Sequence, residues 1–355
     1  MSMQRIARLA YRITHSNLRE LPRPYRLTYA VTNRCQARCT MCDIWRKPAE
    51  NELTLAEIDA LFTRANRFSW INLTGGELFQ RPDISDIFLT VIQRSRDLYL
   101  LNFPTNGFQT EEIVAAVDAI LKQTALPRLI VSVSLDGPRE LHDRIRNLPG
   151  CWDRALGTFR QLRERRSRRF SVFLGHTLQV ANLGEFDKTF AACREELGAL
   201  SADDLHINLA HVSGLYYGNN TFDGTPEPAE ASRLLVRINT QRRHKPFSPI
   251  AFIERRYQQL ARIYLKDGTV PLTCQAAAAS CFIDPTGNVF PCSGFASLLG
   301  SLSENDMDLY RIWRSPIRLH TRKQVHDDAC PGCWTPCEAY QTILANLLQL
   351  KGKNR

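Results

Sequence analysis

Residues 31–43 read VTNRCQARCTMCD and place Cys35, Cys39 and Cys42 in a C-x3-C-x2-C run. Three thiolates this close together can bind three irons of a [4Fe–4S] cube and leave the fourth iron open to a small molecule. The alternatives are a zinc knuckle or a loop of unrelated thiols. Structural zinc takes four ligands, typically as two close pairs, and no nearby His or fourth Cys completes such a set. The run therefore predicts an iron–sulfur cluster with one open iron.

The chain has 355 residues, of which 44% are hydrophobic, so it can bury a larger core than one small domain needs. Its eleven cysteines do not form the short framework of a secreted disulfide-rich protein. The sequence opens with no signal-peptide pattern, and no run of about 18 apolar residues could span a bilayer. These features predict a cytoplasmic protein.

The formal net charge is +10, which raises the question of a nucleic-acid or acidic-membrane partner. The densest basic run, residues 160–169, holds six arginines at the expected end of a helix, where cations stabilise the helix dipole. No aromatic residues alternate with them as a base-stacking surface requires. We therefore expect a solvated helix end and no nucleic-acid partner.

Short stretches rich in β-branched and aromatic residues alternate with amphipathic helical stretches, which predicts a parallel sheet built from βα units. The expected strands are 25–31, 69–74, 98–104, 128–135, 170–178 and 204–212. The expected helices are 55–66, 84–96, 111–123, 152–166 and 186–197, the first of them opened by a capping box at Thr54 and Glu57. Six units fit an α/β fold, a partial (β/α)6 TIM-like barrel whose chemistry gathers at the C-terminal strand ends.

After about residue 213 the alternation stops, and from about residue 271 the cysteine density rises. We therefore expect five segments. They are a basic N-terminal segment (1–24), the partial barrel (25–213), a loop with connecting helices (214–270), a small cysteine-rich domain (271–345) and a basic tail (346–355).

The cysteine run and its Asn-x-Cys context resemble the radical S-adenosylmethionine (radical SAM) superfamily, whose fold is the same partial barrel. The resemblance implies that SAM chelates the open iron and is cleaved reductively to methionine and a 5′-deoxyadenosyl radical. That radical would abstract hydrogen from an unactivated carbon. An electron donor such as flavodoxin or ferredoxin is implied as a partner. Met41 departs from the family pattern, which usually has an aromatic residue before the last cysteine, but methionine fills similar apolar space.

Polar and glycine residues follow the later strands, where the resemblance places SAM contacts. The matching motif Gly75-Gly76-Glu77 would accept hydrogen bonds from the methionine ammonium. Ser134 and Asp136 would lie near the ribose or the methionine carboxylate, with Arg146 as a carboxylate partner. The further candidates at strand ends are Thr105, Asn106, Gln179 and Asn182. Each signal is weak alone, because such residues are common in turns and caps; their order along the chain carries the inference. His206 and His211 lie near the sixth strand's end and are candidates to face the cavity.

Six cysteines gather near the C-terminus: Cys274, Cys281, Cys292, Cys330, Cys333 and Cys337. The spacing from Cys274 through Gly287 to Cys292, with the later Cys330-x-x-Cys333 pair, resembles the SPASM and twitch domains, which hold auxiliary iron–sulfur clusters. Six thiols suffice for one four-ligand cluster and are too few for two. A type I turn at residues 284–287 would pair Cys281 with Phe290 and make Cys281 a competing ligand, unless a glycine bulge shifts the register. A structural zinc site is the alternative.

The leading hypothesis is thus a radical SAM enzyme with one auxiliary [4Fe–4S] cluster, acting on an unidentified substrate. Only about 24 residues precede the first strand, too few for a domain that grips a peptide leader, which favours a small molecule, sugar or lipid. A peptide-modifying or protein-modifying maturase is the alternative. From another class, a non-catalytic metal-bearing protein that binds RNA or regulates would use the basic face, but it would need no SAM pocket.

Overall fold

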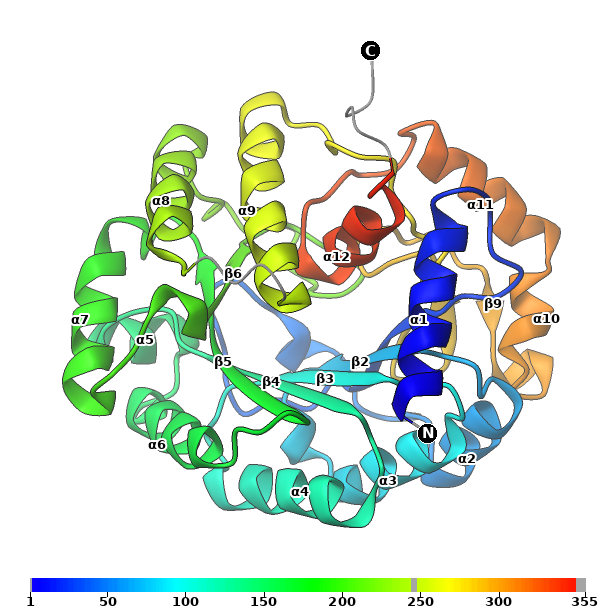
Figure 1. Ribbon diagram of the computed structural model, residues 1–355, viewed down its shortest axis with the longest axis horizontal. Coiled ribbons are helices and arrows are strands. Elements are labelled where there is room, and N and C mark those ends of the chain that lie inside the picture. Colours follow the sequence, from blue (N-terminus) through cyan, green and yellow to red (C-terminus); the bar gives the residue numbers. More distant parts are fainter. Residues whose placement is uncertain (1, 244–247, 349–355) are drawn as a thin grey trace.

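The structure is a computed structural model that describes residues 2–243 and 248–348. Within them a nine-stranded sheet runs in the order β6-β5-β4-β3-β2-β1-β7-β8-β9 (Figure 1). The strands are β1 (Arg26–Thr32), β2 (Trp70–Gly75), β3 (Leu100–Thr105), β4 (Arg128–Ser134), β5 (Phe170–Leu178), β6 (Leu205–Leu209), β7 (Ser280–Ile283), β8 (Asn288–Phe290) and β9 (Gly300–Ser301). Strands β1 to β6 pair in parallel with their neighbours, which confirms the expected α/β barrel-like sheet.

Helices surround this sheet, and α2 to α7 follow its outer side (Figure 1). The helices are α1 (Ser2–Ser16), α2 (Leu55–Arg64), α3 (Ile84–Arg94), α4 (Thr110–Gln123), α5 (Arg139–Arg146), α6 (Cys151–Glu164), α7 (Phe186–Leu197), α8 (Pro228–Gln241), α9 (Pro249–Asp267), α10 (Leu309–Trp313), α11 (Pro316–His326) and α12 (Pro336–Ala345). The α12 segment approaches the open side of the sheet beside α9 and α1, so the last helix returns to the barrel (Figure 1).

The two faces of the strands differ in character. In β5, Phe170, Val172 and Leu174 belong to the main hydrophobic core, whereas the alternating residues Ser171 and Gly175 are partly exposed. This period of two is what a strand buried against helices on one side requires. The other face lines the interior of the barrel, which we call the lumen.

Local signals placed several elements well. The capping box is confirmed: the Thr54 hydroxyl accepts from the Glu57 N–H, and the Glu57 carboxylate accepts from the Thr54 N–H at 2.8 Å. The helix behind it, α2, ends two residues before the expected boundary. Helix α5 was missed, because its sequence RELHDRIR offers few apolar residues to mark a helical period.

The cysteine-rich C-terminal region continues the same sheet. Strand β7 pairs in parallel with β1, with Leu27 opposite Cys281, and β8 and β9 then add antiparallel strands. The hydrophobic core is also continuous, since Ile283, Leu302 and Trp313 belong to the main cluster of the barrel. The barrel and the C-terminal region therefore share one sheet and one core.

The predicted register of the β7–β8 hairpin was wrong by one residue. Phe282, and not Cys281, lies opposite Phe290. The turn forms as expected, with the Gly287 N–H donating to the Asp284 carbonyl at 3.1 Å. However, Gly287 has φ +87°, the left-handed conformation of a glycine bulge, and the extra residue in the loop shifts the pairing.

Among the described residues we find no helix whose length and apolar character would carry it across a membrane. The expected basic tail lies outside the described residues from residue 349 onwards. In the arginine run, Arg163 donates to the carbonyls of Leu197 and Ala199, and Arg169 donates to those of Leu121, Thr124 and Leu126. These arginines therefore fasten helix ends to neighbouring loops.

Candidate active site

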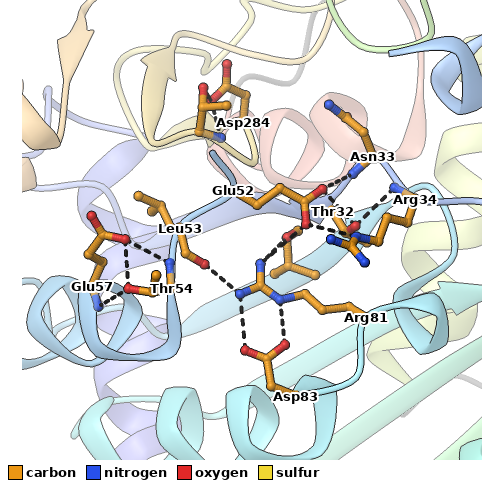
Figure 2. A network of polar contacts seen from close by, with 12 residues as sticks. Thr32, Asn33, Arg34, Glu52, Leu53, Thr54, Glu57, Arg81, Asp83 and Asp284 are labelled. Carbon is orange, nitrogen blue, oxygen red and sulfur yellow. Dashed lines mark hydrogen bonds and ion pairs between the residues drawn. The ribbon is translucent and has the colours of Figure 1, made fainter. Parts of the chain in front are cut away.

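The start of the cysteine loop is held by a buried carboxylate. Glu52 accepts a hydrogen bond from the Thr32 hydroxyl at 2.8 Å and from the Asn33 N–H at 2.7 Å. Figure 2 shows both bonds converging on this one side chain. Because Thr32 is the last residue of β1, Glu52 fixes the direction in which the chain leaves the strand towards Cys35.

Arg81 also holds the end of β1, below the cysteine loop. Its guanidinium donates to the carbonyls of Val31 at 2.6 Å and Leu53 at 2.5 Å, and it pairs with Asp83 at 2.7 Å (Figure 2). Since Arg81 is nearly fully buried, these bonds replace its lost hydration. The end of β1 and the segment before α2 are therefore tied together under the cysteine loop.

Gly75 and Gly76 let the end of β2 touch the cysteine loop directly. A Cβ atom on Gly75 would lie 2.3 Å from the Thr32 carbonyl oxygen, and one on Gly76 would lie 2.3 Å from that of Arg34. The closeness allows the N–H groups of Gly76 and Glu77 to donate to those two carbonyls at 2.9 and 2.8 Å. The glycine pair thus has a structural role in this chain beside any contact with SAM.

Cys35, Cys39 and Cys42 line one cavity of about 310 Å³ that extends into the lumen. Burial raises the pKa of the free Cys35 and Cys42 thiols to about 12, with the neighbouring thiols adding to the effect. Within the described residues no three His, Cys, Asp or Glu side chains converge as they would around a single metal ion. A cubane cluster has a different need, because each thiolate binds its own iron. Three thiols of one loop that share a cavity wall fit that requirement.

Helix α5 also supports the cysteine loop. The N–H groups of Arg38 and Thr40 donate to the carbonyls of Arg146 at 3.1 Å and Ile145 at 2.8 Å. The Arg146 guanidinium lies 3.8 Å from the Cys39 sulfur, within reach of a weak hydrogen bond. Burial raises the pKa of the free Cys39 thiol, and the positive charge of Arg146 opposes this in part.

Asp136 and Arg146 form an ion pair at 2.5 Å. Asp136 is fully buried, and burial is the largest single effect and opposes its charge. Arg146, the two nearby histidines His176 and His142, and the Thr177 N–H together outweigh burial and lower the pKa of the carboxyl. Asp136 also accepts the Thr177 N–H at 2.8 Å. Arg146 and Ser134 line the cavity, whereas Asp136 does not, so Asp136 acts on the site through Arg146.

Gln179 and Asn182 also lie behind the cavity wall. The Asn182 amide donates to the carbonyls of Asp136 and Thr177, both at 2.9 Å, and accepts the Gln179 N–H. The Gln179 amide lies 3.9 Å from the Met41 sulfur. These two residues therefore join the end of β5 to the rest of the site without facing the cavity themselves.

Glu77, Thr105 and Asn106 all line the cavity and are bonded to one another. The Glu77 carboxylate accepts the Thr105 hydroxyl at 2.9 Å and the Asn106 N–H at 2.7 Å. Burial raises the pKa of Glu77 to about 7 in spite of these bonds. Its side chain thus links the ends of β2 and β3.

Several cavity residues escaped sequence reasoning. They are Arg26, Trp70, Asn72, Asn102, Tyr216, Tyr217 and Tyr340. Those on β1, β2 and β3 lie on the lumen face of their strands, where the period of two could have placed them, but the sequence alone does not say which face is inside. Tyr216 comes from a loop and reaches the site through its hydroxyl, which donates to the Gly75 carbonyl at 3.1 Å. His206 and His211, which the sequence left as candidates, both line the cavity.

The C-terminal cysteines divide into two groups. Cys274, Cys292 and Cys330 share a small buried cluster, and a Cβ on Gly294 would lie 4.0 Å from the sulfurs of both Cys292 and Cys333. Burial has the largest effect on the pKa of Cys333 and raises it, and the nearby Cys274 and Cys330 raise it further. Four thiols are thus brought together, the number that a [4Fe–4S] cluster takes from a protein.

Cys281 and Cys337 lie apart from those four thiols. Cys281 belongs to the main hydrophobic core, opposite Leu27 of β1. Cys337 lines the large cavity. Burial raises the pKa of its thiol to about 11, and the nearby charge of Arg26 opposes this increase.

Comparison with protein families agrees with this geometry. Residues 29–193 match the model of the radical SAM superfamily, and residues 274–337 match that of SPASM, an iron–sulfur cluster-binding domain. The chain belongs to the radical SAM superfamily. It is therefore a radical SAM enzyme whose cofactors are a [4Fe–4S] cluster, SAM and an auxiliary cluster in the SPASM domain.

Curated relatives differ in what they make. This radical SAM chain is 27% identical to the AdoMet-dependent heme synthase of Methanosarcina barkeri over 285 residues, 74% of this chain and 76% of that protein. It is 25% identical to the mycofactocin maturase MftC of Mycolicibacterium smegmatis over 325 residues, 89% of this chain and 76% of that protein.

Solved structures share the fold. SuiB of Streptococcus suis bound to S-adenosylmethionine aligns with a TM-score of 0.61 at 15% identity, covering 94% of this chain and 76% of that one. Native anSMEcpe with bound AdoMet aligns with a TM-score of 0.56 at 14% identity, covering 92% of this chain and 98% of that one.

Proposed function

We propose that this enzyme cleaves SAM reductively in the barrel cavity and uses the resulting 5′-deoxyadenosyl radical to abstract hydrogen from an unactivated carbon of a substrate in the lumen. The observation that carries the proposal is the single cavity shared by Cys35, Cys39 and Cys42 and by the lumen residues. The cluster and SAM supply the one-electron chemistry when they are bound. A non-catalytic role is set aside, because the chain belongs to a family of enzymes.

The protein's own residues bind and orient the reactants. We assign Cys35, Cys39 and Cys42 as ligands of the first cluster. We assign the backbone of Gly75 and Gly76, with Ser134, Thr105 and Asn106, to the SAM pocket. Glu77, Asp136, Gln179 and Asn182 would hold that pocket in shape, since their side chains are buried and bonded within the protein. Arg146 lines the SAM pocket and also supports the first cluster, because it lies beside Cys39.

We propose a single auxiliary cluster held by Cys274, Cys292, Cys330 and Cys333. These are the four C-terminal thiols that lie together, whereas Cys281 and Cys337 are directed elsewhere. A low-potential donor such as flavodoxin or ferredoxin would provide the electron. All eleven cysteines are free thiols, which suits a reducing compartment and supports a cytoplasmic location.

For the substrate class we favour a small molecule over a peptide. The relatives called AdoMet-dependent heme synthase include one that matches 74% and another that matches 89% of this chain. The relative called mycofactocin maturase supports the alternative, a peptide substrate.

The experiment is SAM cleavage by anaerobically reconstituted protein with dithionite, followed by mass spectrometry of 5′-deoxyadenosine and methionine. We expect equal amounts of both products from the wild type and none from Cys39→Ala. Cys193→Ala is the matched control, since Cys193 is buried in α7 within the core. Undiminished cleavage by Cys39→Ala, or none by the wild type, would refute the proposed function.

A further inference from the structure

The lumen is lined by polar side chains on consecutive strands. Asn72 of β2 and Asn102 of β3 face it, and their amides are joined by a hydrogen bond of 2.6 Å. The side-chain Oδ1 of Asn102 accepts in turn from the Trp70 indole N–H at 2.6 Å. The other face of the same strands is apolar and packs on helices, so the polar side chains are confined to the lumen face.

The charged residues on the cavity wall are few. Among the described residues that line it, the Arg, Lys, Asp and Glu side chains are Arg26, Arg146 and Glu77. Arg146 is paired with Asp136, and Glu77 is bonded to Thr105 and Asn106. Arg26 is therefore the cation on this wall whose charge is not matched by an ion pair.

Arg26 is 2% exposed, so its charge is almost completely removed from water. Its guanidinium stacks over the Trp70 ring at 4.2 Å and donates to the backbone carbonyls of Cys337 and Pro336. Its Nε–H has no hydrogen-bond partner, and no carboxylate within the described residues forms an ion pair with it. An isolated buried charge is costly unless a counter-ion joins it.

Glu338 is the acidic side chain that most strongly raises the pKa of Arg26, but it does not form an ion pair with it. Glu338 interacts with Arg26 through space, but its Oε2 accepts from Ser280 and Gln341. Burial raises the pKa of Glu338 to about 7, the opposite of what a close ion pair would do.

Arg26 lies at the far end of the lumen from the cysteine loop. It is the first residue of β1, and the cysteine loop follows the last. Seven residues of a strand span about 20 Å at about 3.3 Å per residue. A molecule that contacts Arg26 while presenting a carbon to the SAM end must therefore be elongated.

We propose that Arg26 binds a carboxylate of the substrate, and that the substrate is an elongated organic anion lying along the lumen with its reacting carbon towards the SAM pocket. The guanidinium matches a carboxylate because its N–H groups lie in one plane and can donate side by side. This inference rests on the proposed function, since it takes the lumen as the substrate site. A phosphate ester offers similar oxygens, and we assign the carboxylate because a dianionic phosphate would call for a second unpaired cation, whereas the other arginine on the described wall, Arg146, is already paired with Asp136.

The test uses simple probes in place of the unidentified substrate. Octanoate, its neutral analogue octanamide and octyl phosphate are titrated calorimetrically into reconstituted, oxidised holoenzyme with SAM. We expect octanoate to bind roughly tenfold to hundredfold more tightly than octanamide, the range of a charged hydrogen-bonded pair. Equal binding of acid and amide, or tighter binding of octyl phosphate, would overturn the assignment.

Variants locate the effect at Arg26. Arg26→Gln should bring octanoate and octanamide to within about threefold of each other, and Arg26→Lys should give an intermediate preference, because lysine keeps the charge without the planar fork. Arg128→Gln is the matched control: Arg128 is also the first residue of its strand, but it bonds to Arg168 and Ser171 away from the cavity.

Structural loss can be separated from loss of recognition. If Arg26 only tied α12 to β1, its variants would melt earlier but keep the preference for the acid, and that result would refute the proposal. If Arg26→Gln does not fold, the preference of Arg26→Lys decides, and a preference equal to that of the wild type counts against the proposal. Binding is measured without turnover, so a failure of SAM cleavage by the wild type would count against the proposed function alone.

Discussion

Replacing Gly76 by Ala should separate the end of β2 from the cysteine loop. The added Cβ would lie 2.3 Å from the Arg34 carbonyl oxygen and 2.9 Å from that of Asn33, where ordinary contacts lie at 3.4–4 Å. Both obstacles are backbone atoms, so no side-chain rotation can relieve them. The chain must shift, and the hydrogen bonds from Gly76 to Thr32 and from Glu77 to Arg34 lengthen or break.

The magnitude follows from those two effects. Overpacking a rigid site costs about 1–3 kcal/mol, and each weakened backbone hydrogen bond about 0.5–1.5 kcal/mol. For the two bonds together with the overpacking, we expect Gly76→Ala to lower the free energy of unfolding by about 2–6 kcal/mol. The displaced loop should also bind its cluster poorly, so the iron content should fall by about four per chain.

Urea unfolding followed by circular dichroism, together with iron analysis after reconstitution, measures both effects. Gly157→Ala is the matched control, because Gly157 lies within α6 and a Cβ there meets no atom within 4 Å. It should leave the iron content unchanged and stabilise the protein by about 0.5–1 kcal/mol, the helical advantage of Ala over Gly. Wild-type stability and full iron loading in Gly76→Ala would refute the argument.

The remaining predictions concern the clusters and two buried charges. Reconstituted wild type should hold about eight irons per chain, and Cys333→Ala should hold about four. Cys281→Ala and Cys337→Ala should hold as many irons as the wild type, and loss of iron in either variant would change the proposed ligand set. Arg146→Met should lower the free energy of unfolding by about 3–5 kcal/mol, because it leaves Asp136 charged, buried and unpaired. Arg139→Met, which removes the exposed Arg139–Asp153 pair, should change the free energy of unfolding by less than about 1 kcal/mol. Equal effects of the two substitutions would contradict the predicted importance of the buried pair. The pKa of Glu77 is raised from 4.5 to about 7, so between about pH 4.5 and 7 the folded protein binds more protons than the unfolded chain. The wild type should therefore lose stability relative to Glu77→Gln as the pH rises through this range. If the difference in free energy of unfolding between the two proteins does not change with pH, the pKa of the carboxyl is not raised.

Short-range patterns were the part of the fold that the sequence could predict. The strand–helix alternation, the capping box at Thr54 and the turn at residues 284–287 each depend on residues a few positions apart. The hairpin register failed at the same turn, since the conformation of Gly287 decides it and several turns fit the same letters.

The site shows the same division. The loop holding Cys35, Cys39 and Cys42 could be recognised because its ligands are neighbours in sequence. The sorting of Cys281 and Cys337 away from the other C-terminal thiols depends on pairing with β1 and on the return of α12, which bring together residues hundreds of positions apart. Arg26 carried no signal either, because nothing in its sequence neighbours says that its side of β1 faces the lumen.

The pairing of β7 with β1 also bears on solubility. An open parallel sheet ends in strands whose unpaired N–H and C=O groups can recruit another chain. Here β1 would be such an edge, and Arg26 to Tyr29 of β1 pair instead with Ser280 to Ile283 of β7. The hairpin then passes the edge on to β9, a strand of only two residues. The cluster-binding domain therefore also works as a cap, and a chain cut before residue 280 should aggregate through β1 even though every barrel residue is present.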